Sequence, residues 1–324
     1  MKPVYSRIAG TGRHLPKRVL TNHDLEKMVE TSDEWIRSRT GIERRHVVAD
    51  DETNLDLCEG AARNAMQAAG AGPEDIDLVI VGTTSPDQVF PNMGCLLQQR
   101  LGIHGPVAFS LEAACTGFIY ALSIADKFVK TGASKRALVV GAETLSRMVD
   151  WKDRGTCVLF GDGAGAVVLE ASDEPGIIST HLHADGQYAD LLYFPSGVSK
   201  KPEDFHARRD YIQMKGNEVF KVAVTKLGEI VVEALEANGM TGTDIDWLIP
   251  HQANLRIIEA TARKLKMPMD KVILTVQDHG NTSTASVPMA LDVAVRDGRV
   301  KRGQTLMLEA FGGGFTWGAA LVRY

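Results

Sequence analysis

Cys115 is the residue of this sequence whose type and setting best suit nucleophilic chemistry. It lies between two alanines and a Thr-Gly pair, after an apolar run at 107–111 that predicts a strand. Apolar residues at three-to-four spacing follow it and predict a helix ending at 131–132. Unpaired N–H groups and the positive end of the helix dipole favour a thiolate there. A free cysteine is more often a buried structural residue, but these small neighbours leave room for a ligand.

Two polar residues of the second half are candidates for the remaining groups of a site. His251 follows a predicted buried strand and precedes a predicted helix at 255–266. The carboxyl end of a buried strand is where open α/β sheets bind ligands. Asn281 precedes a predicted helix at about 283–297, and taken alone it is better explained as a helix N-terminal residue.

The elements that would position these residues occur twice along the chain. A strand at 75–81 matches one at 244–250, and the Cys115 corner matches a corner at 280–281. We therefore predict an internal duplication with halves at 1–172 and 173–324. Alternating buried strands and helices indicate an α/β fold whose sheets are covered on both faces. If the halves pack about a pseudo-two-fold axis, the corners of Cys115 and Asn281 face one pocket.

Four further segments carry local predictions. We expect a turn from Gly10 to Pro16, two strands around a glycine turn at 155–170, and a strand at 272–276. Residues 195–209 predict a long polar loop.

The composition bounds the class of protein. The 324 residues are 44% hydrophobic and 24% charged, with no apolar run of membrane-spanning length and no apolar signal-peptide region near Met1. The four cysteines form no C-x-x-C pair, which is typical of a reducing cytoplasm rather than of a disulfide or zinc framework. A net charge of −5 argues against wholesale nucleic-acid binding.

Two weaker motifs do not support other functions. His181 and His183 could ligate a metal, but no cysteine or third histidine lies at ligand spacing. The glycines at 161–165 do not form a G-x-G-x-x-G fingerprint and do not open a predicted helix, so a nucleotide-binding loop is not expected.

Four motifs, taken in order, closely resemble the β-ketoacyl-acyl carrier protein synthase III family, the condensing enzymes that start bacterial fatty-acid synthesis. The likeness runs from Ile8 to Arg323, and its motifs are at 113–118, 251–256, 279–283 and 311–315. The resemblance implies the thiolase fold, in which two mixed five-stranded sheet modules stack in α-β-α-β-α layers. It also implies a homodimer.

The resemblance implies a two-step reaction. Cys115 would attack the thioester of acetyl-CoA, release CoA and keep the acyl group, with the backbone N–H groups of Cys115 and Gly313 as the oxyanion hole. The helix N-terminus and His251 are expected to lower the thiol pKa. Malonyl-acyl carrier protein would then lose CO₂, and His251 and Asn281 would donate hydrogen bonds to the enolate. The CoA thioester is a substrate, so no cofactor and no metal are expected.

The same resemblance implies contacts for the acyl-CoA. Trp35, Arg39 and Arg154 match the family's contacts to the CoA adenine and phosphates, where an indole stacks on a base and guanidiniums pair with phosphates. From the residues alone, a surface tryptophan covered by arginine side chains is an equally good explanation. Phe90 matches the residue that reaches from one subunit into the partner's acyl pocket.

The carrier protein is acidic and this chain is acidic too, so docking requires a local basic surface. Arg256 and Arg263 lie seven residues apart on the predicted helix after His251, which places them on or near one face. A solvated charged face remains an alternative. The basic residues expected to dock the carrier are Lys221, Arg256, Arg263, Lys264 and Lys266.

Several related functions are alternatives to the one that the resemblance implies. A degradative thiolase is disfavoured because it needs a second cysteine where this chain has Gly312–Gly314, and an elongating condensing enzyme needs a histidine where this chain has Asn281. A hydroxymethylglutaryl-CoA synthase, or a condensing enzyme of specialised metabolism with a longer or branched primer, stays open. A non-catalytic acyl-CoA-binding homologue is disfavoured because cysteine, histidine and asparagine are all present.

Overall fold

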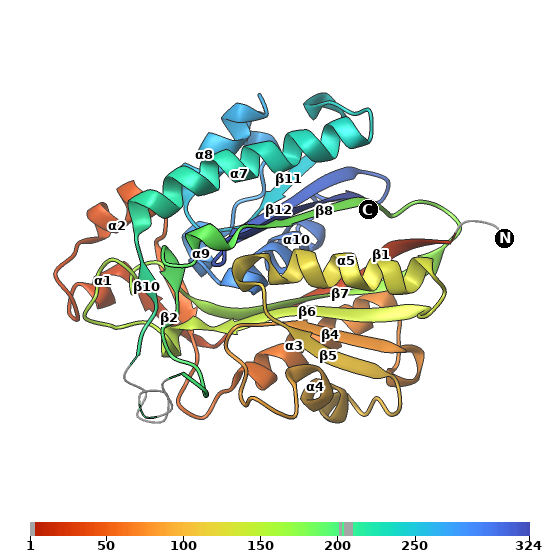
Figure 1. The fold of residues 1–324 in the computed structure, drawn as a ribbon, viewed down its shortest axis with the longest axis horizontal. Coiled ribbons are helices and arrows are strands. Elements are labelled where there is room, and N and C mark those ends of the chain that lie inside the picture. Colours follow the sequence, from red (N-terminus) through yellow and green to blue (C-terminus); the bar gives the residue numbers. More distant parts are fainter. Residues whose placement is uncertain (1–3, 201–202, 204–209) are drawn as a thin grey trace.

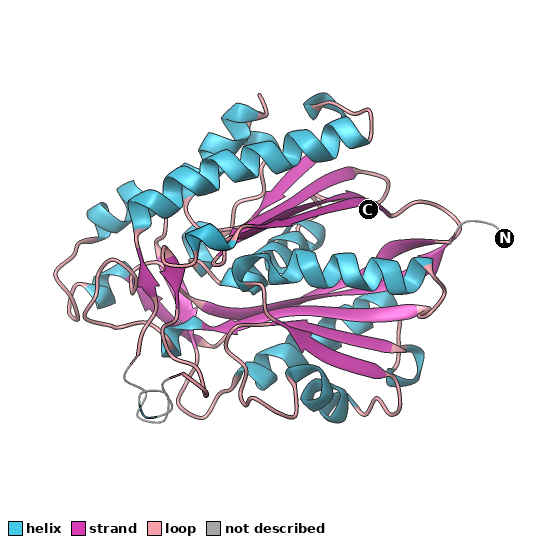
Figure 2. Ribbon diagram, viewed as in Figure 1, coloured by secondary structure: helices cyan, strands magenta, loops and turns pink. Residues whose placement is uncertain are grey.

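The computed structural model describes residues 4–200, 203 and 210–324, and its helices and strands form five layers (Figure 1). From the top of that view the layers are α7 (Gly216–Ala237) with α8 (Leu255–Lys264), a sheet, α5 (Gly117–Lys130) with α10 (Ser286–Arg296), a second sheet, and α3 (Asn54–Ala69) with α4 (Met93–Leu101). Figure 2 shows the same alternation of helical and strand layers. None of the described helices is long and apolar enough to cross a bilayer.

The first sheet contains five strands in the order β1-β7-β6-β4-β5. β4 is parallel to both of its neighbours, whereas β7 is antiparallel to β6 and to β1. β4 is buried along its whole length, as expected for a central strand covered on both faces. The strands are β1 (Tyr5–His14), β4 (Leu78–Gly82), β5 (Val107–Leu111), β6 (Arg136–Thr144) and β7 (Asp162–Ser172).

The second sheet repeats this order with one strand fewer. Its order is β11-β12-β13-β8, with β11 parallel to β12 and the other pairs antiparallel. The boundary expected after residue 172 falls between β7 and β8. The strands are β8 (Ile177–Ala184), β11 (Trp247–Pro250), β12 (Thr305–Gly312) and β13 (Thr316–Arg323).

The strand expected at 272–276 is wrong. Only Val272 bridges to Leu248 of β11, and the chain then enters the short helix α9 (Val276–His279). The reason is the buried side chain of Gln252, whose Nε2 donates to Ile273 O (3.0 Å) and whose Oε1 accepts from Thr275 N–H (2.8 Å). A side-chain amide therefore satisfies backbone groups that a fifth ladder would otherwise pair.

Two glycine-rich segments predicted as turns are strands. Gly10 lies within β1, and Gly165 lies within β7. A Cβ on Gly10 would collide with the backbone of Ala69 in α3, and one on Gly165 would lie 2.6 Å from Met289 N in α10. These glycines therefore serve close helix–sheet packing rather than a change of chain direction. The predicted turn at 10–16 and the predicted strand pair at 155–170 are both wrong for this reason.

The core has three parts. One lies between the two sheets around α5 and α10, one lies under α7 and α8, and one lies under α3 and α4. α5 and α10 are apolar on nearly every side because each is covered by both sheets. Their first residues are consequently held inside the molecule, where the two sheets approach each other.

The remaining elements lie around this frame. The polar segment expected at 195–209 is irregular over residues 195–200, and most of the rest lies outside the described residues. The short elements are β2 (Arg18–Thr21), α1 (Asn22–Leu25), α2 (Asp33–Thr40), β3 (Arg44–Val47), β9 (Leu192–Tyr193), β10 (Gln213–Met214) and the 3₁₀ turns η1 (Pro73–Asp75), η2 (Ala114–Thr116), η3 (Leu145–Arg147), η4 (Gly186–Tyr188), η5 (Gly242–Asp244), η6 (Met269–Lys271) and η7 (Ser283–Ala285).

Candidate active site

Two corners with the same backbone conformation meet at the centre of the molecule. The first is η2, which leads into α5, and the second is η7, which leads into α10. Each begins with a non-glycine residue in the left-handed region, Ala114 at φ 45° and Ser283 at φ 48°. The Thr284 hydroxyl donates to Ala114 O (2.7 Å), so the corners touch. The positional counterpart of Cys115 is therefore Thr284, not Asn281, which lies three residues earlier.

Cys115 lies on the first of these corners with 8% of its surface exposed. Burial raises the pKa of the Cys115 thiol to about 12, against a hydrogen bond from the Ser283 hydroxyl that lowers it. The nearby carboxylates of Glu143 and Glu112 raise the pKa further. The expectation of a lowered thiol pKa is therefore wrong for the unliganded site, because removal of the sulfur from water outweighs the donors around it.

Glycine is required directly behind this cysteine. A Cβ on Gly312, the last residue of β12, would lie 2.5 Å from Cys115 N, and one on Gly313 would lie 3.7 Å from the Ala114 Cβ. The backbone of Gly312 thus packs against the η2 corner where no side chain fits, whereas a Cβ on Gly313 would be in ordinary contact with that corner and would instead crowd Leu192 O at 2.9 Å. This places Gly313, the second residue predicted for the oxyanion hole, beside the corner of Cys115.

Asn281 is 7% exposed and is held by its backbone. Its N–H donates to Leu159 O (2.8 Å) and its carbonyl accepts from Gly161 N–H (3.0 Å). Its side-chain Oδ1 accepts from Ser283 N–H (2.9 Å). Because the oxygen is fixed by this bond, the side-chain NH₂ is oriented away from Ser283 and is available as a donor.

His251 follows β11 and is 5% exposed. Its N–H donates to Glu309 O (2.8 Å), and its ring Nδ1 lies 2.5 Å from the Ser286 Oγ. Burial lowers the pKa of His251 to about 3, so the ring is neutral near pH 7. The Ser286 hydroxyl can donate to Nδ1 or accept from it, which leaves Nε2 as donor in one tautomer and acceptor in the other.

One short segment connects the three predicted catalytic residues. Ser283 contacts Asn281, Thr284 contacts Ala114 next to Cys115, and Ser286 contacts His251. The start of α10 therefore holds groups from both halves of the chain in one neighbourhood. Sequence reasoning missed both serines, although the run of hydroxyl residues from Thr282 to Ser286 is a signal that could have revealed them.

The residues predicted for CoA are brought together. Trp35 is half-buried in α2, and the guanidinium carbons of Arg39 and Arg154 lie 4.8 and 5.0 Å from the centre of its ring. Arg154 also donates to Glu30 O (3.1 Å). The side chains come from two segments, α2 and the turn at Arg154, which are more than 110 residues apart, and they form one surface cluster with two cationic groups on an indole.

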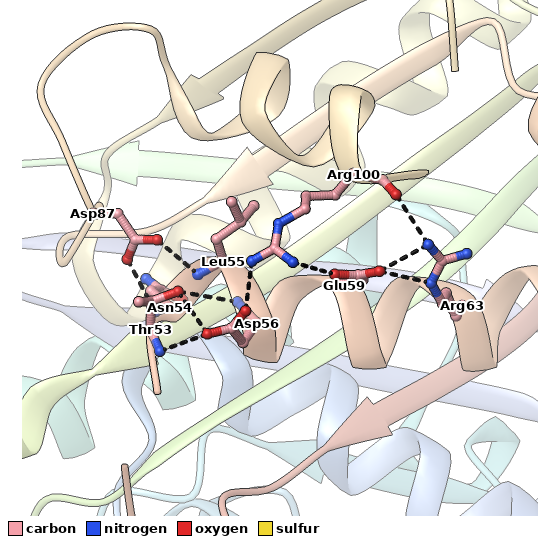
Figure 3. Close-up of polar contacts among 8 residues, drawn as sticks. All are labelled: Thr53, Asn54, Leu55, Asp56, Glu59, Arg63, Asp87 and Arg100. Carbon is pink, nitrogen blue, oxygen red and sulfur yellow. Dashed lines mark hydrogen bonds and ion pairs between the residues drawn. The ribbon is translucent and has the colours of Figure 1, made fainter. Parts of the chain in front are cut away.

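Phe90 is 83% exposed at the tip of the 83–92 loop. Figure 3 shows how the base of this loop is fixed: the Asp87 carboxylate accepts from Asn54 N–H (3.0 Å) and Leu55 N–H (3.2 Å) at the start of α3. In the same view Arg100 of α4 lies between Asp56 and Glu59 of α3. The tip therefore extends a large apolar side chain from an anchored base.

The basic residues predicted for docking are all exposed on α7, on α8 or at the end of α8. Arg256 lies over the Phe220 ring (5.5 Å), beside Lys221. Arg263 approaches Glu259 (4.0 Å), and Lys264 lies against Gly228 at the rim of a surface hollow of about 570 Å³ lined by three glutamates. The positive charge is therefore less compensated around Arg256 than around Lys264.

Glu143, at the end of β6, connects the two halves and was missed from the sequence. Its buried carboxylate accepts from the hydroxyls of Ser85 (2.6 Å) and Thr84 (3.0 Å) in the first half, and from those of Thr284 (2.9 Å) and Ser283 (3.2 Å) in the second. Burial raises the pKa of Glu143, whereas these donors lower it.

A second buried carboxylate has a different setting. Glu309 of β12 is fully buried, and neither carboxylate oxygen has a hydrogen-bond partner among the described residues. Burial raises the pKa of Glu309 to about 8.

His181 and His183, the weak metal candidates, both contact the carboxylate of Glu233 (3.0 and 2.8 Å).

Comparison with known proteins identifies the family of this chain. The family described as 3-oxoacyl-[acyl-carrier-protein (ACP)] synthase III matches residues 109–186, and the family described as its C terminal matches residues 235–324. A protein of Thioalkalivibrio sulfidiphilus named beta-ketoacyl-[acyl-carrier-protein] synthase III is 67% identical over 320 residues, which are 99% of each chain. The protein of that name from Xanthomonas campestris is 63% identical over 100% of this chain and 99% of its own.

Solved structures confirm the predicted fold class. The 3-oxoacyl-[acyl-carrier-protein] synthase III of Aquifex aeolicus superimposes with a TM-score of 0.93 at 49% identity, covering 98% of this chain and 100% of its own. The priming β-ketosynthase of the R1128 polyketide pathway gives 0.94 at 37% identity, covering 99% and 96%. On sequence and structure together, this chain belongs to the 3-oxoacyl-[acyl-carrier-protein] synthase III family.

Proposed function

We propose that this protein catalyses the initiating condensation of type II fatty-acid synthesis. Acetyl-CoA acylates Cys115, and malonyl-acyl carrier protein then reacts to give acetoacetyl-acyl carrier protein, CO₂ and CoA. The observation that carries the proposal is the convergence of the Cys115 corner, His251 and Asn281 on one short segment, Ser283–Ser286, through contacts to Ala114, His251 and Asn281. Family membership supports the same reaction.

Acyl transfer requires the thiol proton to leave as the carbon–sulfur bond forms, because burial keeps Cys115 protonated at rest. His251 is neutral, and with Nδ1–H donating to Ser286 its Nε2 is a free acceptor. The sulfur attacks the thioester carbonyl, and the backbone N–H groups of Cys115 and Gly313 stabilise the oxyanion. The tetrahedral intermediate collapses, and the CoA sulfur leaves with the proton returned by His251.

Condensation uses the other tautomer of His251. The malonyl carboxylate leaves as CO₂, and its electron pair moves into the thioester as an enolate. His251 Nε2–H and the Asn281 NH₂ each donate a hydrogen bond to the enolate oxygen. The enolate carbon attacks the acetyl carbonyl on Cys115. The carbon–sulfur bond breaks, and the cysteine sulfur takes up a proton from solvent, which is the one proton that decarboxylative condensation consumes.

Acyl-CoA would enter past Trp35, Arg39 and Arg154, where an indole and two guanidiniums suit an adenine and phosphates. Gly41 at the end of α2 packs against Leu255 at the start of α8, so this cluster adjoins the helix that follows His251. Replacement of Trp35 by alanine should raise the KM for acetyl-CoA and leave the KM for the carrier substrate unchanged.

The acidic carrier protein would dock on the exposed basic side chains of α7 and α8. Lys221 and Arg256 should contribute most, because Arg263 and Lys264 have acidic neighbours. Lys221→Ala with Arg256→Ala should raise the KM for malonyl-acyl carrier protein more strongly at low salt than at high salt. Lys301→Ala, an exposed lysine in the α10–β12 connection, is the control.

Two copies of the chain would complete the acyl pocket. β5 is the edge strand of the first sheet, and Val107 at its start is 54% exposed; the loop that follows the neighbouring strand β4 presents the exposed side chains of Val89 and Phe90. An unpaired edge with apolar side chains suits pairing with a second copy. Phe90 would then extend into the partner's acyl pocket.

All four cysteines are free, which suits the cytoplasm, where this pathway's substrates occur.

Intact-protein mass spectrometry tests the reaction. Addition of acetyl-CoA should produce a mass gain of one acetyl group on Cys115, and malonyl-acyl carrier protein should then remove it with formation of acetoacetyl-acyl carrier protein. Absence of the adduct contradicts the proposal. A panel of straight and branched acyl-CoA primers separates fatty-acid initiation from a priming role like that named for the R1128 ketosynthase.

A further inference from the structure

The two corners are held by the same type of hydrogen bond from different side chains. In the second half, Asn281 Oδ1 accepts from Ser283 N–H at 2.9 Å. In the first half, Glu112 Oε1 accepts from Ala114 N–H at 2.9 Å. In both cases the acceptor lies two residues before the donor, and three residues before the corner position of Thr284 or Cys115. Glu112 is therefore the counterpart of Asn281.

The residue between acceptor and nucleophile explains why this bond matters. Ala114 adopts φ 45°, a conformation that costs energy for any residue with a Cβ. Its carbonyl also accepts from the Thr284 hydroxyl (2.7 Å), so both the N–H and the carbonyl of Ala114 are hydrogen-bonded. The direction of the Cys115 side chain depends on this residue, since Cys115 is the next along the chain.

We propose that Glu112 is a positioning residue for Cys115, acting through the hydrogen bond that its carboxylate accepts from Ala114 N–H. The proposal rests on the proposed role of Cys115 as nucleophile and adds a residue outside the catalytic triad. An exposed glutamate would otherwise be free in solvent, and this one is instead folded back onto the corner.

Glu112 also carries a charge, and the charge acts in the opposite sense. Its carboxylate raises the pKa of Cys115, as does that of Glu143 at the end of β6, while the Ser283 hydroxyl lowers it and His251 is neutral. Position and charge can therefore be separated. Glutamine keeps an oxygen that accepts from Ala114 N–H and removes the charge, whereas alanine removes both.

The test compares Glu112→Gln, Glu112→Ala and the control Glu174→Ala, an exposed glutamate in the β7–β8 connection. Iodoacetamide alkylation of Cys115 is followed by mass spectrometry, together with kcat and KM for acetyl transfer. Because the pKa of Cys115 is about 12, alkylation rates are compared at fixed pH below that value. The rate should rise above wild type in Glu112→Gln, which loses only the charge. The alkylation rate of Glu112→Ala should fall about three- to tenfold below that of Glu112→Gln, and kcat should fall about three- to tenfold only in Glu112→Ala, with KM unchanged.

Two results would overturn the proposal: a Glu112→Ala variant that alkylates as fast as Glu112→Gln and keeps the wild-type kcat, or a Glu112→Gln variant that loses as much as the alanine variant. The alkylation readout needs no CoA substrate. A protein whose Cys115 alkylates normally but accepts no acetyl group would therefore contradict the proposed function while still giving an answer on Glu112.

Discussion

The corner of Cys115 and the corner of Thr284 have nearly the same backbone but different chemistry. Both place a left-handed residue at the entrance to a buried helix, and both tie that residue to an acceptor two positions earlier. In the first half the reactive group is the corner residue itself, a thiol. In the second half the corner residue, Thr284, is hydrogen-bonded to Ala114 and Glu143. The candidate hydrogen-bond donor to the substrate is instead Asn281, three residues earlier.

This difference shows how a duplicated fold can build an asymmetric site. The shared backbone fixes where side chains can meet, because each left-handed corner directs its neighbours toward the other half. Side-chain identity then assigns a nucleophile to one corner and a hydrogen-bond donor to the other. Substitutions at the two corners should therefore affect different steps of the reaction.

Removal of the nucleophile should have the largest effect. Cys115→Ala should lower acetyl transfer by on the order of 10⁴-fold or more, because no other group can carry the acyl chain. Mass spectrometry after acetyl-CoA addition should show no adduct. Cys95→Ala, a partly buried cysteine on α4, should acylate normally. An adduct on the Cys115→Ala protein would show that the nucleophile lies elsewhere.

Asn281→Asp separates the two roles of Asn281, which are to accept a hydrogen bond within the corner and to donate one to the substrate. Aspartate keeps an oxygen that accepts from Ser283 N–H but loses the NH₂ donor. Condensation should fall by about 10²–10³-fold, while acetylation of Cys115 stays within a few-fold of wild type. Single-turnover measurement of the two half-reactions checks this. Equal loss in both half-reactions would mean that Asn281 only shapes the corner.

Glu143→Gln should weaken the contact between the halves. The amide NH₂ would face hydroxyl donors that now bond to a carboxylate, which leaves buried donors unsatisfied at a cost of about 1–3 kcal/mol. Urea unfolding should show a lower midpoint with an unchanged slope. Wild-type stability in this variant would show that the hydroxyls find other partners.

Glu309→Gln should change activity least, because its effect is confined to the pH dependence of stability. Its folded pKa of about 8 lies above the ordinary value of 4.5, so the folded state binds the proton more tightly than the unfolded chain. The wild type should therefore lose stability as pH rises from about 4.5 to about 8, and glutamine should flatten that slope. Thermal unfolding midpoints at pH 5 and pH 8 measure the difference. Parallel slopes in the two proteins would contradict it.

Much of the fold could be predicted from local patterns in the sequence. The strand before Cys115, the helix after it, and the repeated order of elements follow from apolar spacing, which reflects burial directly. Glycine was the recurrent source of error. Gly10 and Gly165 look like turn residues in the sequence, but they allow α3 and α10 to approach the sheet, and such packing has no local signature.

The site was predictable to the level of residue type and not to the level of protonation. A strand-to-helix corner with small neighbours marked Cys115, position after a buried strand marked His251, and the family motifs marked Asn281. Burial, which decides that His251 is neutral and that Cys115 holds its proton, is a property of the folded packing. Ser283 and Ser286 were missed because a hydroxyl gains its role only from its neighbours in space.

Gln252 has a consequence for assembly. Its amide occupies the backbone groups at 273–276, so the second sheet ends at β11 without the open strand that β5 provides in the first sheet. At this end of the duplicated fold only one of the two equivalent edges can accept another chain. An edge that pairs with its own copy across a two-fold axis is consumed by that pairing. The homodimer proposed above would use the β5 edge, and the second sheet would offer no matching edge strand, so that growth through this end would stop at two copies.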